Sequence, residues 1–92
     1  MLKLLEALEN RLSNILEPLE VRGKNCFLTE SGAVIHLTAV PKYHAIVVEF
    51  ADNRESAEKL QFEDGDAIST DGLGENDENE ILSAILQEIE QS

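Results

Sequence analysis

The residues with the clearest capacity for chemistry are the acids of the segment FEDGDAISTDGLGENDENE at 62–80. Carboxylates are the hard oxygen ligands that Ca²⁺ and Mg²⁺ prefer. The segment is interrupted by glycines and offers four aspartates, Asp64, Asp66, Asp71 and Asp77. Their spacing departs from the EF-hand loop, which needs a ligand at its fifth position and a glycine at its sixth. Counted from Asp64, these positions hold Ile68 and Ser69. The pattern favours a solvated acidic loop at 63–80, and a divalent-metal-linked switch through that loop is an alternative.

Groups suited to nucleophilic or acid–base catalysis are few. The chain has two histidines, His36 and His44, and a single cysteine, Cys26. No serine or cysteine stands at a spacing from either histidine that indicates a catalytic arrangement, and no Cys/His spacing typical of zinc sites is present. Cys26 beside Phe27 is typical of a small buried hydrophobe. We therefore expect neither enzyme activity nor a cofactor.

The strongest structural pattern lies at 33–51, AVIHLTAVPKYHAIVVEFA. Two runs rich in β-branched residues, 33–40 and 45–51, flank a four-residue break that begins at Pro41. In the second run Ile46, Val48 and Phe50 share one face, which is the period-two pattern of a half-buried strand. The segment predicts a β-hairpin with its loop at 41–44.

Amphipathic helices are predicted at both ends of the chain. Leucine and isoleucine recur at three- and four-residue steps over 2–16, and Glu17-Pro18 ends that pattern. The last helix is predicted to start at Asp77 as its N-cap, with Glu80 as the partner three residues later. Its apolar stripe consists of Ile81, Leu82, Ile85, Leu86 and Ile89. The two stripes offer more aliphatic surface than three short strands obviously cover. Core packing is the default role of both, and any part of one stripe left over would form a homodimer contact or a groove for a partner helix.

Shorter elements complete the predicted fold. Residues 26–29 have the composition of a first strand, followed by a turn at 30–32. Residues 53–60 predict a short helix, whereas 59–63 and 66–70 alternatively predict two short strands around a turn at Asp64-Gly65. Residues 71–79 predict a solvated loop. We expect one small α+β domain over 1–92, in which a three-stranded antiparallel meander, extended by a fourth short strand in the alternative, carries both helices on the face of Ile46, Val48 and Phe50.

The charge of the chain is concentrated in one half. The formal net charge is −12, and residues 49–92 hold fourteen acids against only Arg54 and Lys59. Such a surface repels phosphate backbones, so we expect no direct nucleic-acid binding. No apolar run reaches the length of a membrane span, and the first residues lack the pattern of a signal peptide. With a single cysteine, these features favour a cytoplasmic protein.

The function that these features favour is protein binding without catalysis, by an adaptor, a chaperone-like protein or an inhibitor. The sheet face opposite the helices is predicted to be rather apolar, which indicates a partner with an apolar surface or a homodimer, although valines are also common on the exposed faces of strands. The acidic C-terminal half indicates a partner with a basic surface. The candidate contact residues on this face and in the acidic loop are Val34, His36, Val40, Val47, Glu63, Asp64, Asp66 and Asp71. A nucleic-acid mimic that blocks a basic protein is the alternative.

The predicted order of elements, together with the strong acidity, loosely resembles bacterial type III secretion chaperones. The resemblance covers a helix, three strands, a mixed segment and a last helix, with no shared sequence motif. It implies a protein that binds another protein.

Overall fold

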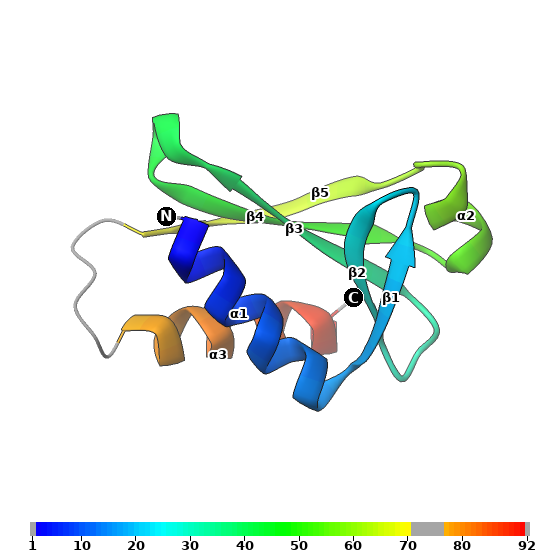
Figure 1. Cartoon of the computed structure of the whole chain (residues 1–92), viewed down its shortest axis with the longest axis horizontal. Coiled ribbons are helices and arrows are strands. Elements are labelled where there is room, and N and C mark those ends of the chain that lie inside the picture. Colours follow the sequence, from blue (N-terminus) through cyan, green and yellow to red (C-terminus); the bar gives the residue numbers. More distant parts are fainter. Residues whose placement is uncertain (1, 71–76, 92) are drawn as a thin grey trace.

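The computed structural model describes residues 2–70 and 77–91 and has an α+β architecture (Figure 1). Helix α1 (Leu2–Ile15) precedes four strands, β1 (Glu17–Val21), β2 (Lys24–Leu28), β3 (Val34–Val40) and β4 (Ala45–Ala51). The short helix α2 (Arg54–Glu58), strand β5 (Glu63–Ser69) and helix α3 (Asp77–Gln91) follow. The strands form one antiparallel sheet in the order β1-β2-β3-β4-β5. The predicted meander is confirmed, and the structure extends it at both edges.

Helices α1 and α3 cover one face of the sheet, as the apolar alternation of the central hairpin predicts (Figure 1). Leu8 and Leu12 of α1 and Ile85 of α3 have no exposed surface. They pack in one cluster with the inward-facing side chains of the strands, which include Phe27, Ile35, Leu37, Ile46 and Val48. Burial of this aliphatic surface is the main stabilising contribution to the fold.

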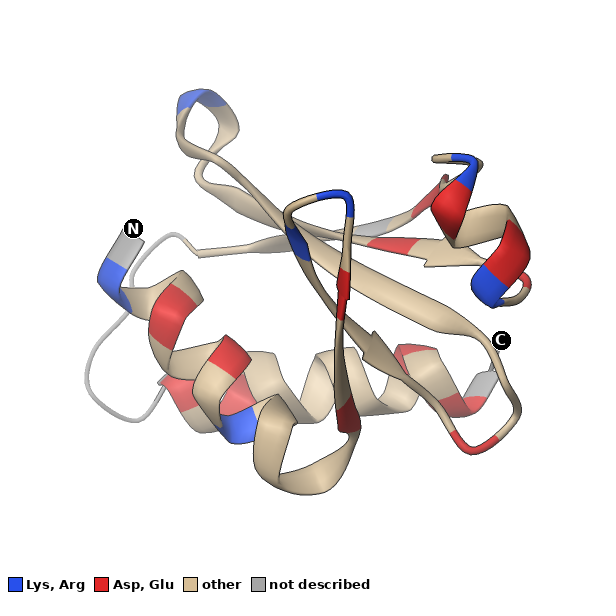
Figure 2. Cartoon of the chain, turned by 45° about the vertical axis from the view of Figure 1, so that its right-hand side comes forward, with Lys and Arg blue, Asp and Glu red and all other residues tan. Residues whose placement is uncertain are grey.

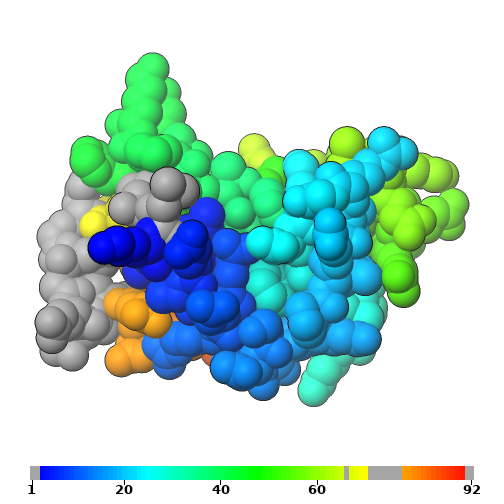
Figure 3. Space-filling model, viewed as in Figure 1, coloured from blue at the N-terminus to red at the C-terminus, as the bar shows by residue number. Residues whose placement is uncertain are grey.

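The central hairpin has the predicted boundaries, except that β3 starts at Val34, one residue later than predicted. Every residue of β3 pairs with a residue of β4, from Val34 opposite Ala51 to Val40 opposite Ala45. The loop is a 3₁₀ turn, Pro41–Tyr43, and His44 closes it in the left-handed region at φ 47°. Figure 3 shows this turn projecting from the surface.

Strand β1 was not predicted, and β2 begins two residues before the predicted first strand. Between them Arg22 and Gly23 have φ of 49° and 81°. Positive φ at both central residues is what a two-residue type I′ hairpin turn requires, and its twist matches that of the flanking strands. Gly23 adopts this conformation without steric cost, whereas Arg22 adopts it only because the two strands hold it there. This hairpin therefore lies in a segment for which the sequence predicted no element before residue 26.

The segment 53–70 contains both a short helix and a strand. The helix predicted at 53–60 is confirmed as α2, and β5 provides a further strand. The turn predicted at Asp64-Gly65 is wrong, because both residues lie inside β5. A Cβ on Gly65 would lie 2.7 Å from the Val48 carbonyl oxygen and 2.8 Å from Phe50 Cε2. Glycine is needed here because neighbouring groups approach its backbone closely.

The remaining predictions concern the region after β5. Of the loop predicted at 71–79, residues 71–76 lie outside the described residues, and the rest belongs to α3. Asp77 is the first residue of α3, so it lies within the helix and not before it as an N-cap. Among the described residues, no helix is long and apolar enough to cross a membrane.

Candidate binding surfaces

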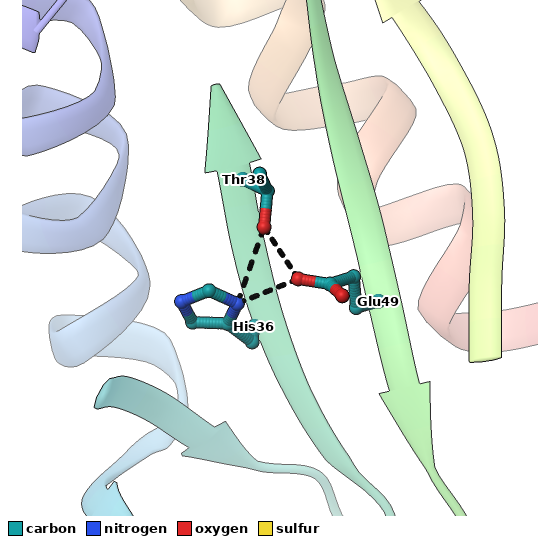
Figure 4. A network of polar contacts seen from close by, with 3 residues as sticks. All are labelled: His36, Thr38 and Glu49. Atoms are coloured by element: carbon teal, nitrogen blue, oxygen red, sulfur yellow. Dashed lines mark hydrogen bonds and ion pairs between the residues drawn. The ribbon is translucent and has the colours of Figure 1, made fainter. Parts of the chain in front are cut away.

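The sheet face away from α1 and α3 carries a compact polar network (Figure 4). His36 of β3 stands directly opposite Glu49 of β4 in the hairpin register. His36 Nδ1 lies 2.8 Å from Glu49 Oε1, and the Thr38 hydroxyl donates a hydrogen bond to the same oxygen. The two ion-pair side chains are only 18% and 20% exposed. The rings of Phe62 and His36 are tilted by 55° to each other, with their centroids 6.2 Å apart.

The electrostatics of this network hold Glu49 in its charged form. Partial burial raises the pKa of the Glu49 carboxyl, but the hydrogen bonds from Thr38 and His36, the His36 charge and Lys24 outweigh burial and lower the pKa. The carboxylate then accepts both hydrogen bonds, so Nδ1 is the protonated nitrogen of His36 in this contact. The network joins the two central strands through a charged acceptor.

Cys26 completes a row of chemically active residue types across three strands. It pairs with His36 in the β2–β3 register, so Cys26, His36 and Glu49 are neighbours on one face. The thiol is suited to packing and not to attack, because Cys26 is 1% exposed and burial raises its pKa despite the charge of Lys24. His44, the other histidine considered in the sequence, lies apart from this row at the β3–β4 turn.

This face of the sheet is divided into a covered half and an open half. In the covered half Val34 and Ala51 are buried under Ala57 of α2 and cluster with Val21 and Cys26 of the first hairpin. Val34, a predicted contact residue, has no exposed surface, so its place on an exposed face was wrongly predicted. The sequence did not reveal that five residues of helix would fold back over this end of the hairpin.

The open half consists of Thr38, Val40, Val47 and Ala67, where β3, β4 and β5 run side by side (Figure 1). Val40 and Val47 are half-buried, Ala67 is exposed, and none of the described helices covers them. Tyr43, 70% exposed, extends this surface at the turn beyond the strands. Of the predicted contact residues, Val40 and Val47 lie in the open half and His36 lies at its border.

The predicted acidic residues are spread over β5 and beyond. Glu63 and Asp64 are exposed, and they pair with Phe50 and Glu49 respectively, so they point to opposite faces. Asp71 and the side chains of Asp66 and Asp77 lie outside the described part of the structure. Within that part, no group of three or more His, Cys, Asp or Glu residues is placed to hold a metal ion. Metal binding through Asp64, Asp66, Asp71 and Asp77 stays a prediction.

A second surface lies at the C-terminal ends of α1 and α3. The two helix ends and the β2–β3 turn enclose a hollow of about 410 Å³. Its apolar lining comes from Ile15 at the end of α1, from Leu16 directly after that helix, and from Leu86 and Ile89 of α3. Glu30 and Glu90 lie at its edge. The apolar stripes of both helices predicted more aliphatic surface than the sheet covers. The packing of the helices in the structure shows that the exposed part of this surface lies at their C-terminal ends.

No protein-family model matches this chain, and comparisons with curated proteins and with solved structures also yield no match. The element order that resembles type III secretion chaperones had three strands before the mixed segment, whereas the structure has four before α2. The function therefore has to be inferred from the chemistry of the two surfaces.

Proposed function

We propose that the chain is a small protein-binding module without catalytic activity, whose partner contacts the open half of the sheet. The observation that carries this proposal is the partial exposure of Val40 and Val47 on adjacent central strands. An apolar patch on a strand surface is stabilised when a partner removes it from water. The neighbouring Tyr43 offers an aromatic ring and a hydroxyl, a combination that is frequent at protein interfaces.

Two further observations support a binding module over an enzyme. The row of Cys26, His36 and Glu49 has a buried thiol of raised pKa, and the carboxylate is already engaged by two side chains. A nucleic-acid mimic is less favoured, since both acids of α2 are paired with bases. Arg54 Nε lies 3.9 Å from Glu58 Oε1, and Lys59 Nζ lies 3.1 Å from Glu55 Oε1. These positive charges interrupt the row of carboxylates that a mimic of the phosphate backbone would need. The predicted cytoplasmic location is part of this proposal.

The proposal is tested by substituting Val47→Lys and measuring binding to proteins retained from a native lysate at low and moderate salt. The variant places a solvated charge in the middle of the open half, so we expect at least a tenfold loss of the specific partner. Leu60→Lys is the matched control, because Leu60 is 45% exposed after α2 and away from the open half. Equal retention by both variants would remove the basis of the proposal.

Light scattering distinguishes a different partner from a second copy of the chain. If the protein is a dimer that Val47→Lys makes monomeric, the open half is a homodimer interface. Circular dichroism of each variant confirms that a loss of binding does not reflect unfolding.

A further inference from the structure

The hollow at the helix ends leaves aliphatic side chains exposed to water. Ile15 is 54% exposed, although Leu12, one turn earlier in the same stripe, has no exposed surface. Leu16, Leu86 and Ile89 are only partly buried at the margin of the core. The volume of about 410 Å³ falls in the range of about 300–1,000 Å³ that is usual for ligand clefts. The hollow is therefore large enough, and apolar enough in its lining, to bind apolar side chains of a partner.

The surroundings of this hollow are negative. Figure 1 shows α1 and α3 ending on the same side of the molecule, near the β2–β3 turn. The last turn of a helix leaves carbonyl groups without intrahelical partners and carries a partial negative charge. Neither helix has a basic residue in its last turn. Glu30 from the turn and Glu90 from α3 add two carboxylates at the edge.

The basic residues of the described chain lie elsewhere. On the helical side, Arg11 contacts Glu78 and Asn79 at the other end of α3, and Lys3 is at the start of α1. Figure 2 shows the other Lys and Arg positions at the β1–β2 hairpin, the β3–β4 turn and α2. The negative end of the helix pair is thus left without cations from its own fold.

We propose that this hollow is a docking site for a cationic amphipathic helix of a partner protein. The partner's aliphatic side chains, spaced three and four residues apart, would cover Ile15, Leu16, Leu86 and Ile89. Its flanking Lys and Arg would meet Glu30, Glu90 and the two helix ends. A second copy of this chain fits less well, because the net charge is −12 and the edge of the hollow would face acids of the same sign. The site is separate from the open half of the sheet and does not depend on the function proposed for it.

The test uses a fluorescently labelled synthetic helix of about 15 residues, long enough to be helical when bound, with leucines on one face and lysines on the other. A scrambled peptide of identical composition separates an amphipathic match from simple charge attraction. We expect saturable binding of the first peptide only, and it should weaken as salt rises from about 50 to 300 mM. Amide chemical-shift changes in the ¹⁵N-labelled protein should centre on Leu16, Leu86 and Ile89.

Matched variants locate the site. Ile15→Ser removes an exposed aliphatic group from the lining and should weaken peptide binding about tenfold. Leu60→Ser removes an aliphatic side chain of similar exposure, 45%, from the segment after α2, outside both candidate surfaces, and should change the affinity less than about twofold. Glu30→Gln with Glu90→Gln should reduce the salt dependence, whereas Glu6→Gln near the start of α1 should not.

Four results would overturn the inference: equal binding of the scrambled peptide, no saturable binding, an unchanged affinity of Ile15→Ser, or a protein dimer that Ile15→Ser dissociates. The last result would assign the hollow to a second copy of the chain. Val47→Lys should bind the peptide normally, so failure of the open sheet half and failure of this hollow are distinguishable.

Discussion

Glu49 combines partial burial with a charge that the fold stabilises. Its side chain is 20% exposed, and it accepts hydrogen bonds from residues of the neighbouring strand. Its pKa is lower in the folded protein than in the unfolded chain. Folding therefore gains stability from the ionised form, and this gain is present above the ordinary glutamate pKa of about 4.3. It is lost as the pH falls through the lower pKa of the folded state.

We expect Glu49→Gln to lower the free energy of unfolding at pH 7 by on the order of 1 kcal/mol, because a charged acceptor is replaced by a neutral one. The difference between variant and wild type should shrink as the pH falls through the lowered pKa of Glu49 and the carboxyl becomes protonated. Urea titrations across this pH range measure the effect, with the exposed Glu63→Gln as control. A difference that stays constant with pH would show that Glu49 acts through packing and not through charge.

Gly65 is the second residue with a specific role. We expect Gly65→Ala to destabilise the protein by on the order of 1–3 kcal/mol, since its Cβ would press against Val48, Phe50 and Glu88. Thermal unfolding measures the loss. Ala67→Ser in the same strand is the control and should be nearly neutral, because Ala67 is exposed. If Gly65→Ala unfolded at the wild-type temperature, the close contact of β5 with β4 would be refuted.

Among the elements, the short helix α2 decides which part of the sheet face is covered. Its five residues place Ala57 over Val34 and Ala51 and so close one half of the sheet face. The isolated sequence is far too short to be a stable helix in water, so tertiary packing and capping maintain it. The Asn53 side chain accepts a hydrogen bond of 2.8 Å from the Ser56 amide and provides that cap.

We expect Asn53→Ala to cost about 1 kcal/mol of stability, while Asn53→Asp, which keeps an acceptor oxygen, should cost little. Hydrogen exchange should show faster exchange in α2 of the alanine variant, with protection of the β3–β4 pairs largely retained. Equal protection in both variants would mean that packing of Ala57 alone maintains the helix.

At the scale of the whole molecule, the net charge of −12 opposes compaction through self-repulsion. We expect the melting temperature to rise by a few degrees when NaCl is increased from about 20 to 300 mM, because screening weakens this repulsion. CaCl₂ at matched ionic strength tests the metal prediction at the same time. A further rise with calcium, lost in Asp64→Asn, would establish a divalent site, whereas a fall in melting temperature with NaCl would contradict the repulsion argument.

The amino-acid sequence by itself determined the central hairpin, the two terminal helices and the face on which they pack. These features follow from apolar periodicity, which depends on local geometry: alternation over 33–51 and three- and four-residue steps in each helix. The hairpin loop that begins at Pro41 and the end of the first helix before Pro18 were also predictable from sequence, because proline restricts its own backbone and that of the residue before it.

Tertiary structure alone decided the β1–β2 hairpin, the strand role of Asp64-Gly65 and the two candidate surfaces. Arg22 at positive φ is unfavourable in isolation and is held by strand pairing. Gly65 serves close packing instead of a turn, a difference that depends on Val48 and Phe50. Val34 and Ile15 both belong to apolar stripes, yet one is fully buried and the other 54% exposed. The exposure of a residue depends on which elements pack over it. Local periodicity does not predict those contacts, because the elements meet only after the chain has folded.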